Sequence, residues 1–283
     1  MTLEKLLEGQ KIVEPDNVRS RPTWVRGEVR IDGDEIVLDG STAERYAIPG
    51  SEHGATLLFD LGALGKLGEM IDVGEDSDTR LINAVRLTDT GRALEFGRAH
   101  GLLWHGPRQV GKGEVRESLR KWLFAGLDVS INLATYASIR RSQEEDSAEA
   151  VRSYLRAQRD GGFFKRIAMP DDDDDLLEWA SIQLAERISR GMAGGAPTLT
   201  AACSLSRDGV KVGGAGDFRF GYEPDSLKGA ANYQLARLIS RKKLVRECAE
   251  CGEMFLPTDP RQREHRRCGN RKRKREERKA RRT

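Results

Sequence analysis

The chain has 283 residues, enough for one large domain or two smaller ones with their own hydrophobic cores. Hydrophobic residues make up only 38% of it and charged residues 33%, and no apolar run approaches the ~20 residues that a membrane-spanning helix needs. The polar lead-in, residues 1–20, lacks the apolar segment of a signal peptide, so we expect a cytoplasmic protein with no membrane partner.

The net charge of +3 hides a strong asymmetry along the chain. Residues 261–283 contain thirteen Lys or Arg and three Glu, a local excess of +10, which leaves −7 on the other 260 residues. Like charges crowd together where a polyanion or an acidic surface compensates them. We therefore expect an acidic body joined to a basic segment that contacts an anionic partner.

The first predicted elements are strands. Residues 22–49 alternate apolar and polar side chains around the turn dipeptides Asp32-Gly33 and Asp39-Gly40, which predicts two or three short antiparallel strands. Residues 56–61 are compatible with one further strand.

Helical spacing of apolar residues then dominates the chain. It predicts helices over about 89–100, 114–141, 151–158, 174 to 191 or 192, and 226–243. The acidic stretch 142–148 is a predicted surface loop, and residues 198–222 form a hairpin turned by Asp208-Gly209. The predicted fold class is α+β: N-terminal antiparallel strands, a mostly helical middle with a hairpin, and a small C-terminal zinc finger followed by a basic helix.

Two charged motifs in the body favour ordinary structural roles. Residues 106–113 resemble the phosphate-binding loop G-x-x-x-x-G-K-[ST], but a glycine replaces the hydroxyl residue that would hold Mg²⁺, so a flexible loop is the better interpretation. The five aspartates 171–175 lack the ligand spacing of a calcium loop and favour the start of a helix, where the helix dipole stabilises acids. The body shows no nucleophile–base pattern, and we expect no enzymatic activity.

Three of the four cysteines fall within 21 residues, a spacing typical of a metal site rather than of a disulfide framework. Cys248, Cys251, His265 and Cys268 give the pattern C-x2-C-x13-H-x2-C, and a Cys3His set closes the tetrahedral shell of one structural Zn²⁺. Gly252 permits the turn after the second cysteine, and Phe255 is expected to pack beneath it. His265 could instead be a surface residue or a phosphate contact.

The remaining candidate ligands have no such spacing. Cys203 lies in an apolar run and is expected to be a buried, inert thiol. His53, His100 and His105 are expected to be ordinary histidines.

The motif Cys-x-x-Cys-Gly-x-x-Phe, followed by Cys268-Gly269-Asn270-Arg271 and a basic helix, resembles the CGNR-type zinc finger of bacterial proteins, a treble-clef-like unit. The resemblance covers residues 248–282. It implies a DNA-binding or transcription-regulating protein. The family usually has a cysteine preceded by an aromatic residue before the CGNR element, whereas this chain has Glu264-His265 at a shorter spacing.

The basic segment is predicted to bind nucleic acid, most simply the phosphate backbone of duplex DNA, because no aromatic residue lies between the cations to stack on single-stranded bases. Arg266 and Arg267, beside the metal, are the residues best placed for guanine edges. The full set of predicted contacts is Arg263, Arg266, Arg267, Arg271, Lys272, Arg273, Lys274, Arg275, Arg278, Lys279, Arg281 and Arg282.

The chain therefore divides into a body, residues 1–244, and a finger with its tail, residues 245–283. The body would receive a small-molecule signal or a protein partner. One alternative is an interaction module that docks the finger on an acidic protein or on the ribosome. A second is a solvated tail that only keeps the protein soluble. A third is a nucleotide-dependent enzyme that uses the loop at 106–113.

Overall fold

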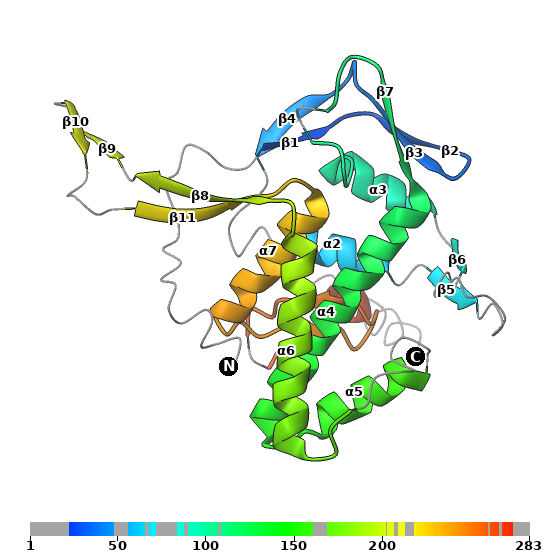
Figure 1. Cartoon of the computed structure of the whole chain (residues 1–283). Coiled ribbons are helices and arrows are strands. Elements are labelled where there is room, and N and C mark those ends of the chain that lie inside the picture. The colour runs from blue at the N-terminus through cyan, green and yellow to red at the C-terminus, as the bar shows by residue number, and fades with distance from the viewer. Residues whose placement is uncertain are drawn as a thin grey trace.

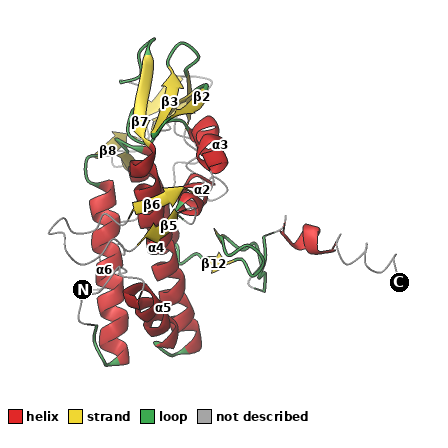
Figure 2. Cartoon of the chain, turned by 90° about the vertical axis from the view of Figure 1, so that its right-hand side faces the viewer, coloured by secondary structure: helices red, strands yellow, loops and turns green. Residues whose placement is uncertain are grey.

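The computed structural model has an α+β fold in which a small β-layer covers one end of a helical bundle (Figures 1 and 2). The described residues are 23–47, 56–65, 68–71, 84–87, 90–106, 109–160, 169–201, 203–206, 209–212, 218–259, 261–265 and 268–273. The predictions for residues 1–20 and for His53 lie outside these ranges. Among the helices that are described, none has the length and apolar character needed to span a bilayer.

The β-layer is built from antiparallel pairs. β1 (Thr23–Arg26) pairs with β4 (Glu44–Ala47), and β3 (Glu35–Asp39) lies between β2 (Val29–Asp32) and β7 (Glu114–Ser118). The predicted N-terminal strands are thus confirmed, with four in place of two or three. Gly33 at the β2–β3 turn has a positive φ of 59°, which glycine adopts without strain.

Two predictions, one of a strand and one of a helix, were wrong at the level of element type. Residues predicted as a possible strand at 56–61 lie in helix α2 (Thr56–Leu64), whose buried residues Leu57, Leu58, Leu61 and Leu64 follow helical spacing. Residues 114–118, predicted as the first turns of a helix, form β7, and α4 (Leu119–Glu145) begins only after it. Pairing with β3 overrides the local helical preference, because register with a distant strand is a tertiary effect.

The helical predictions otherwise hold. α3 (Thr90–His100) ends at Gly101, which has a φ of +82°, as the glycine signal predicted. α4 continues to Glu145, beyond the predicted end at Arg141, and therefore covers part of the stretch predicted as a surface loop. α5 spans Glu149–Asp160 and α7 spans Leu227–Ser240.

The run of aspartates caps a helix, as expected. α6 spans Asp173–Met192, and the Asp172 side chain accepts hydrogen bonds from the backbone N–H groups of Asp174 and Asp175. The acids lie at the positive end of the helix dipole, which stabilises them without a bound cation.

A two-stranded ribbon connects α6 to α7 and extends from the bundle (Figure 1). β8 (Ala196–Ala201) pairs with β11 (Phe218–Glu223), and β9 (Cys203–Ser206) pairs with β10 (Gly209–Val212) around the predicted turn. The hairpin prediction is confirmed, whereas the Cys203 side chain lies outside the described part. A further pair, β5 (Gly68–Ile71) with β6 (Ala84–Leu87), was not predicted.

The bundle packs around α4, which contacts α2, α5, α6 and α7. α2 approaches α4 very closely where Gly126 faces it: a Cβ atom on Gly126 would lie 2.7 Å from the Leu61 carbonyl oxygen. Trp122 is fully buried in the same helix and makes an edge-on contact with Phe96 of α3. α4 therefore joins the β-layer, the bundle and the finger.

A buried carboxylate holds the β-layer to the helices. Glu117 of β7 is 4% exposed and accepts hydrogen bonds from the backbone N–H groups of Leu103, Trp104 and His105 at 2.6–2.9 Å. The Trp122 indole N–H donates to the same carboxylate at 2.6 Å, and His105 Nδ1 lies 2.8 Å from it. His105 is thus a bonded structural residue, as is His100, whose Nε2 lies 2.9 Å from Asp60.

Glu117→Gln should lower the free energy of unfolding by about 2–4 kcal/mol, because an amide N–H₂ would face donors that need an acceptor in a buried site. Urea unfolding followed by circular dichroism measures the change. Glu114→Gln, on the exposed side of the same strand, should have a much smaller effect, because solvent screens its ion pair with Arg30. Equal losses for the two variants would contradict a special role for Glu117.

A second polar link joins three helices of the bundle. Asp128 of α4 pairs with Arg187 of α6 and with Lys228 of α7, each at 2.9 Å. Burial opposes ionisation of Asp128, but the two cations outweigh it and hold the pKa of the carboxyl below its usual value.

Asp128→Asn should destabilise the fold by about 1–3 kcal/mol, because two half-buried cations lose their counter-charge. Since the folded-state pKa is lowered, the contribution of the wild-type carboxylate is complete above about pH 5 and declines as the pH falls below about 4. The difference in unfolding free energy between wild type and variant, measured from pH 7 to pH 3, should shrink accordingly. Glu144→Gln, an exposed change on the same helix, is the control and should show neither effect.

Candidate metal centre

A short hairpin begins the finger. β12 (Arg246–Glu247) pairs with β13 (Met254–Phe255), and the turn between them carries the first two cysteines. Gly252 has a φ of +68°, the left-handed conformation predicted for it. Its N–H donates to the Cys248 carbonyl at 2.8 Å, and the Cys248 N–H donates to the Glu253 carbonyl at 2.9 Å. This turn directs the two thiols of Cys248 and Cys251 to one side.

The other two candidate ligands come from the segment that folds back over the turn. The Ala249 N–H donates to the Arg263 carbonyl at 3.0 Å, and the His265 N–H donates to Cys248 Sγ at 3.4 Å. Cys268 lies on a helical turn that is described over residues 268–273, and the Gly269 N–H donates to the His265 carbonyl at 2.9 Å. The backbone thus brings His265 and Cys268 to the turn.

The four predicted ligands converge. One ligand atom from each of Cys248, Cys251, His265 and Cys268 can be chosen so that all lie within 4.8 Å of one another. His265 Nδ1 is 3.3 Å from Cys251 Sγ and 3.9 Å from Cys268 Sγ. A tetrahedral Zn²⁺ with bonds of about 2.0–2.3 Å separates its ligand atoms by roughly 3.3–3.8 Å. The two His265 separations are close to this range, and the four residues could hold one metal ion.

The electrostatics of the thiols also favour a cation. Burial opposes ionisation of Cys248, but the backbone N–H groups of His265, Cys251 and Glu250 outweigh it and lower its pKa to about 6. Burial and the neighbouring sulfurs of Cys248 and Cys268 raise the pKa of Cys251 to about 11. The crowded sulfurs therefore resist carrying several negative charges together unless a cation compensates them.

The finger has little core apart from this cluster. Cys248, Phe255 and Cys268 form a small buried group separate from the main core, and the Phe255 ring lies 4.8 Å from the His265 ring. Phe255 packs beneath the turn, as predicted. With so little apolar surface, metal binding supplies most of the folding free energy of such a unit.

The finger rests against the body beside α4 (Figure 2). Arg92 of α3 forms an ion pair with Glu253 at 2.8 Å, and the Tyr136 hydroxyl of α4 donates to the Lys243 carbonyl at 2.8 Å. Val245 is buried in the main core immediately before β12. These contacts fix where the metal centre lies relative to the bundle.

The described cations of the predicted nucleic-acid surface differ in their environment. Arg271, Lys272 and Arg273 are exposed on helix 268–273, which points away from the body (Figure 2). Lys272 forms ion pairs with Glu264 at 3.0 Å and with Glu250 at 3.7 Å. Arg263 is exposed and faces a pocket between finger and body. The other predicted contacts lie outside the described residues: Arg266, Arg267, Lys274, Arg275, Arg278, Lys279, Arg281 and Arg282.

Elsewhere in the described chain, no second group of three or more His, Cys, Asp or Glu side chains is close enough to hold an ion. The loop that resembles a phosphate-binding motif leads into strand β7 rather than directly into a helix, and the Gly40 N–H donates to its Gly113 carbonyl at 3.1 Å. Sequence reasoning did not identify Arg246, which shares the pocket with Arg263; its only signal is its position two residues before the first cysteine.

Comparison with known proteins gives no relative for this chain: no protein-family model, no curated protein and no solved structure matches it. The geometry of the site therefore carries the functional argument.

The purified protein should contain one Zn²⁺ per chain, and Cys268→Ser should lower its zinc affinity by at least about 100-fold, because an incomplete shell must recruit water. His265→Ala should have a smaller but clear effect, and His265→Cys should restore binding. Competition with a chromogenic chelator measures the affinities.

His105→Ala is the matched control, because His105 is a half-exposed histidine that is bonded to Glu117 and is not one of the four candidate ligands. It should retain full zinc content. Zinc binding that survives both Cys268→Ser and His265→Ala would show that these side chains do not hold the ion.

Proposed function

We propose that this chain is a zinc-finger nucleic-acid-binding protein, specifically a bacterial DNA-binding regulator of transcription whose C-terminal unit is of the CGNR type. One observation carries the proposal. Cys268, the last candidate ligand, lies on the described helical turn 268–273 with the exposed Arg271 and Arg273, so the ion would hold this part of the basic segment. Arg271 and Arg273 then project from a held element rather than from a free tail.

The chemistry of the basic segment favours the phosphate backbone of a duplex. Arginine and lysine side chains bind phosphate oxygens without regard to sequence, and each neutralised phosphate releases condensed counterions. Arg266 and Arg267 adjoin the His265 and Cys268 ligands, and we propose that they reach base edges, where arginine pairs with guanine. The donor set would fill the shell of the ion, so the proposed role is binding and not catalysis.

The negative charge of the body supports a role for the finger and tail, and not for the body, in contact with DNA. Its excess of negative charge repels a polyanion, which limits contact with DNA to the finger and the tail. Because Arg92 and Tyr136 tie the finger to the bundle, a partner or ligand that binds the body would act on the orientation of the finger.

Binding to a fluorescent random-sequence DNA duplex should weaken steeply with salt, with a slope of roughly −0.9 for each phosphate neutralised. A chain that ends at Arg273 loses six tail cations and should bind at least about tenfold more weakly, with a shallower slope. Chelation of the metal should weaken binding further, because the remaining arginines are no longer held. Fluorescence anisotropy over 50–200 mM salt would measure all three effects.

Arg156→Gln removes an exposed cation from α5, on the body, and should leave affinity and slope unchanged. Binding that is unaffected by the tail truncation and by salt would overturn the proposal. Tight binding to an acidic protein or to ribosomes, with no affinity for DNA, would instead support the interaction module.

A further inference from the structure

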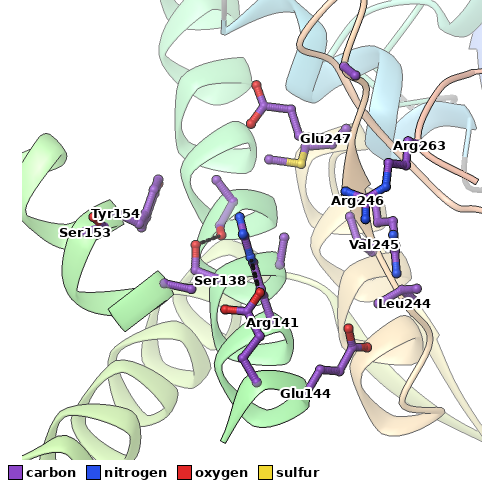
Figure 3. Close-up of a pocket in the computed structure, with 16 residues that line it drawn as sticks. Ser138, Arg141, Glu144, Ser153, Tyr154, Leu244, Val245, Arg246, Glu247 and Arg263 are labelled. Carbon is purple, nitrogen blue, oxygen red and sulfur yellow. Dashed lines mark hydrogen bonds and ion pairs between the residues drawn. The ribbon is translucent and has the colours of Figure 1, made fainter. Parts of the chain in front are cut away.

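A pocket of about 620 Å³ lies where the finger meets the body (Figure 3). Figure 3 shows Ser153 and Tyr154 of α5 on one side, Ser138, Arg141 and Glu144 of α4 in the middle, and the segment from Leu244 to Glu247 with Arg263 opposite. Its volume lies within the range of sites that enclose small molecules. It belongs neither to the metal centre nor to the exposed face of helix 268–273.

The pocket has an apolar and weakly polar lining on the helices and at the start of the finger. Ala134, Ala137 and Ala150 leave room because their side chains are small, while Val245 and Met254 add apolar surface. The hydroxyl groups are occupied: Ser138 donates to the Ala134 carbonyl at 2.8 Å, and Tyr154 donates to the Ile131 carbonyl at 3.3 Å. This wall of the pocket therefore suits an apolar or aromatic part of a ligand better than a strongly polar part.

The charged groups of the pocket are not all neutralised within it. Arg141 pairs with Glu145 at 2.9 Å, and Glu247 has a partner of its own. The guanidinium groups of Arg246 and Arg263 have no ion-pair or hydrogen-bond partner among the described residues. Against these two cations the pocket retains only Glu144, an exposed carboxylate at the last turn of α4.

We propose that this pocket binds an organic anion of metabolite size. The acidic group of the anion would lie between Arg246 and Arg263, and its apolar part would lie against the alanines of α4 and α5. Arginine suits this role because its planar fork donates two parallel hydrogen bonds to a carboxylate or a similar acid. Apolar contact and a small number of convergent polar groups are the usual composition of a ligand site.

Because of the position of the pocket, a bound ligand would stabilise the contact between the finger and the body. Its walls come from the body on one side and from the finger on the other, so a bound anion bridges the two. A ligand that contacts both parts stabilises the docked arrangement in proportion to its affinity and concentration. The inference stands without the DNA-binding proposal, because it concerns a separate site.

Anilinonaphthalene sulfonate is a suitable probe for the full-length, zinc-loaded protein, because it is an organic anion with an apolar aromatic body and fluoresces when bound. It should bind saturably at one site. Phenylnaphthylamine, which has nearly the same apolar body without the acidic group, should bind at least about tenfold more weakly, since it cannot pair with arginine.

Arg246→Gln and Arg263→Gln should each reduce the affinity for the sulfonate roughly three- to tenfold, the loss expected for one charge-assisted contact. Arg261→Gln, an exposed arginine of the same finger that does not line the pocket, should change nothing. Ala150→Trp fills the pocket and should abolish saturable binding, while zinc content and thermal unfolding show that the fold is kept.

Several results would overturn the proposal. Equal binding of the two probes would show that the arginines do not select an anion. Sulfonate binding that survives Ala150→Trp, or that falls equally in Arg261→Gln, would place the probe outside the pocket. If Ala150→Trp unfolds the protein, the two glutamine variants decide the question by themselves.

Discussion

The finger depends on the convergence of four ligand atoms from residues that span 21 positions of the chain. Three sulfurs and one imidazole nitrogen come within 4.8 Å of one another, and among the described residues Phe255 completes a small buried cluster with Cys248 and Cys268. Burial, and after it the neighbouring sulfurs of Cys248 and Cys268, raise the pKa of the Cys251 thiol. A bound cation would favour the thiolate forms of these cysteines and, through Cys268, would hold the helical turn 268–273 that carries Arg271 and Arg273.

The body supplies a rigid support on which the finger rests. α4 runs through the bundle and contacts α2, α5, α6 and α7, and two polar links tie it to its surroundings. Glu117 fixes the loop after α3 and the Trp122 indole on α4, and Asp128 joins α4 to α6 and α7. Because Tyr136 of the same helix holds the segment that enters the finger, the orientation of the finger is set by the bundle. The proposed anion pocket lies at this junction, where a ligand contacts helix and finger together.

Features with a local cause were predictable from the sequence. The spacing of Cys248 and Cys251 with Gly252 after them determines a turn that directs both thiols to one side, and the structure has that turn. The end of α3 at Gly101 and the cap at Asp172 are likewise short-range effects, in which a few neighbouring residues satisfy backbone groups. The helix at residues 56–64 could also have been predicted from the sequence, because Leu57, Leu58, Leu61 and Leu64 have helical spacing. The interpretation of this segment as a strand overlooked that spacing.

Residue types and short spacings were enough to predict the α+β class, the four candidate ligands and the separation of a basic segment from an acidic body. The strand at residues 114–118 could be found only in the folded chain, because β3, which pairs with it, lies about 80 residues earlier in the sequence. The tertiary structure alone showed that Glu117 is buried among its donors and that Arg246 and Arg263 share a pocket with α4 and α5. Such contacts depend on how distant segments pack, and neither periodicity nor local charge carries that information.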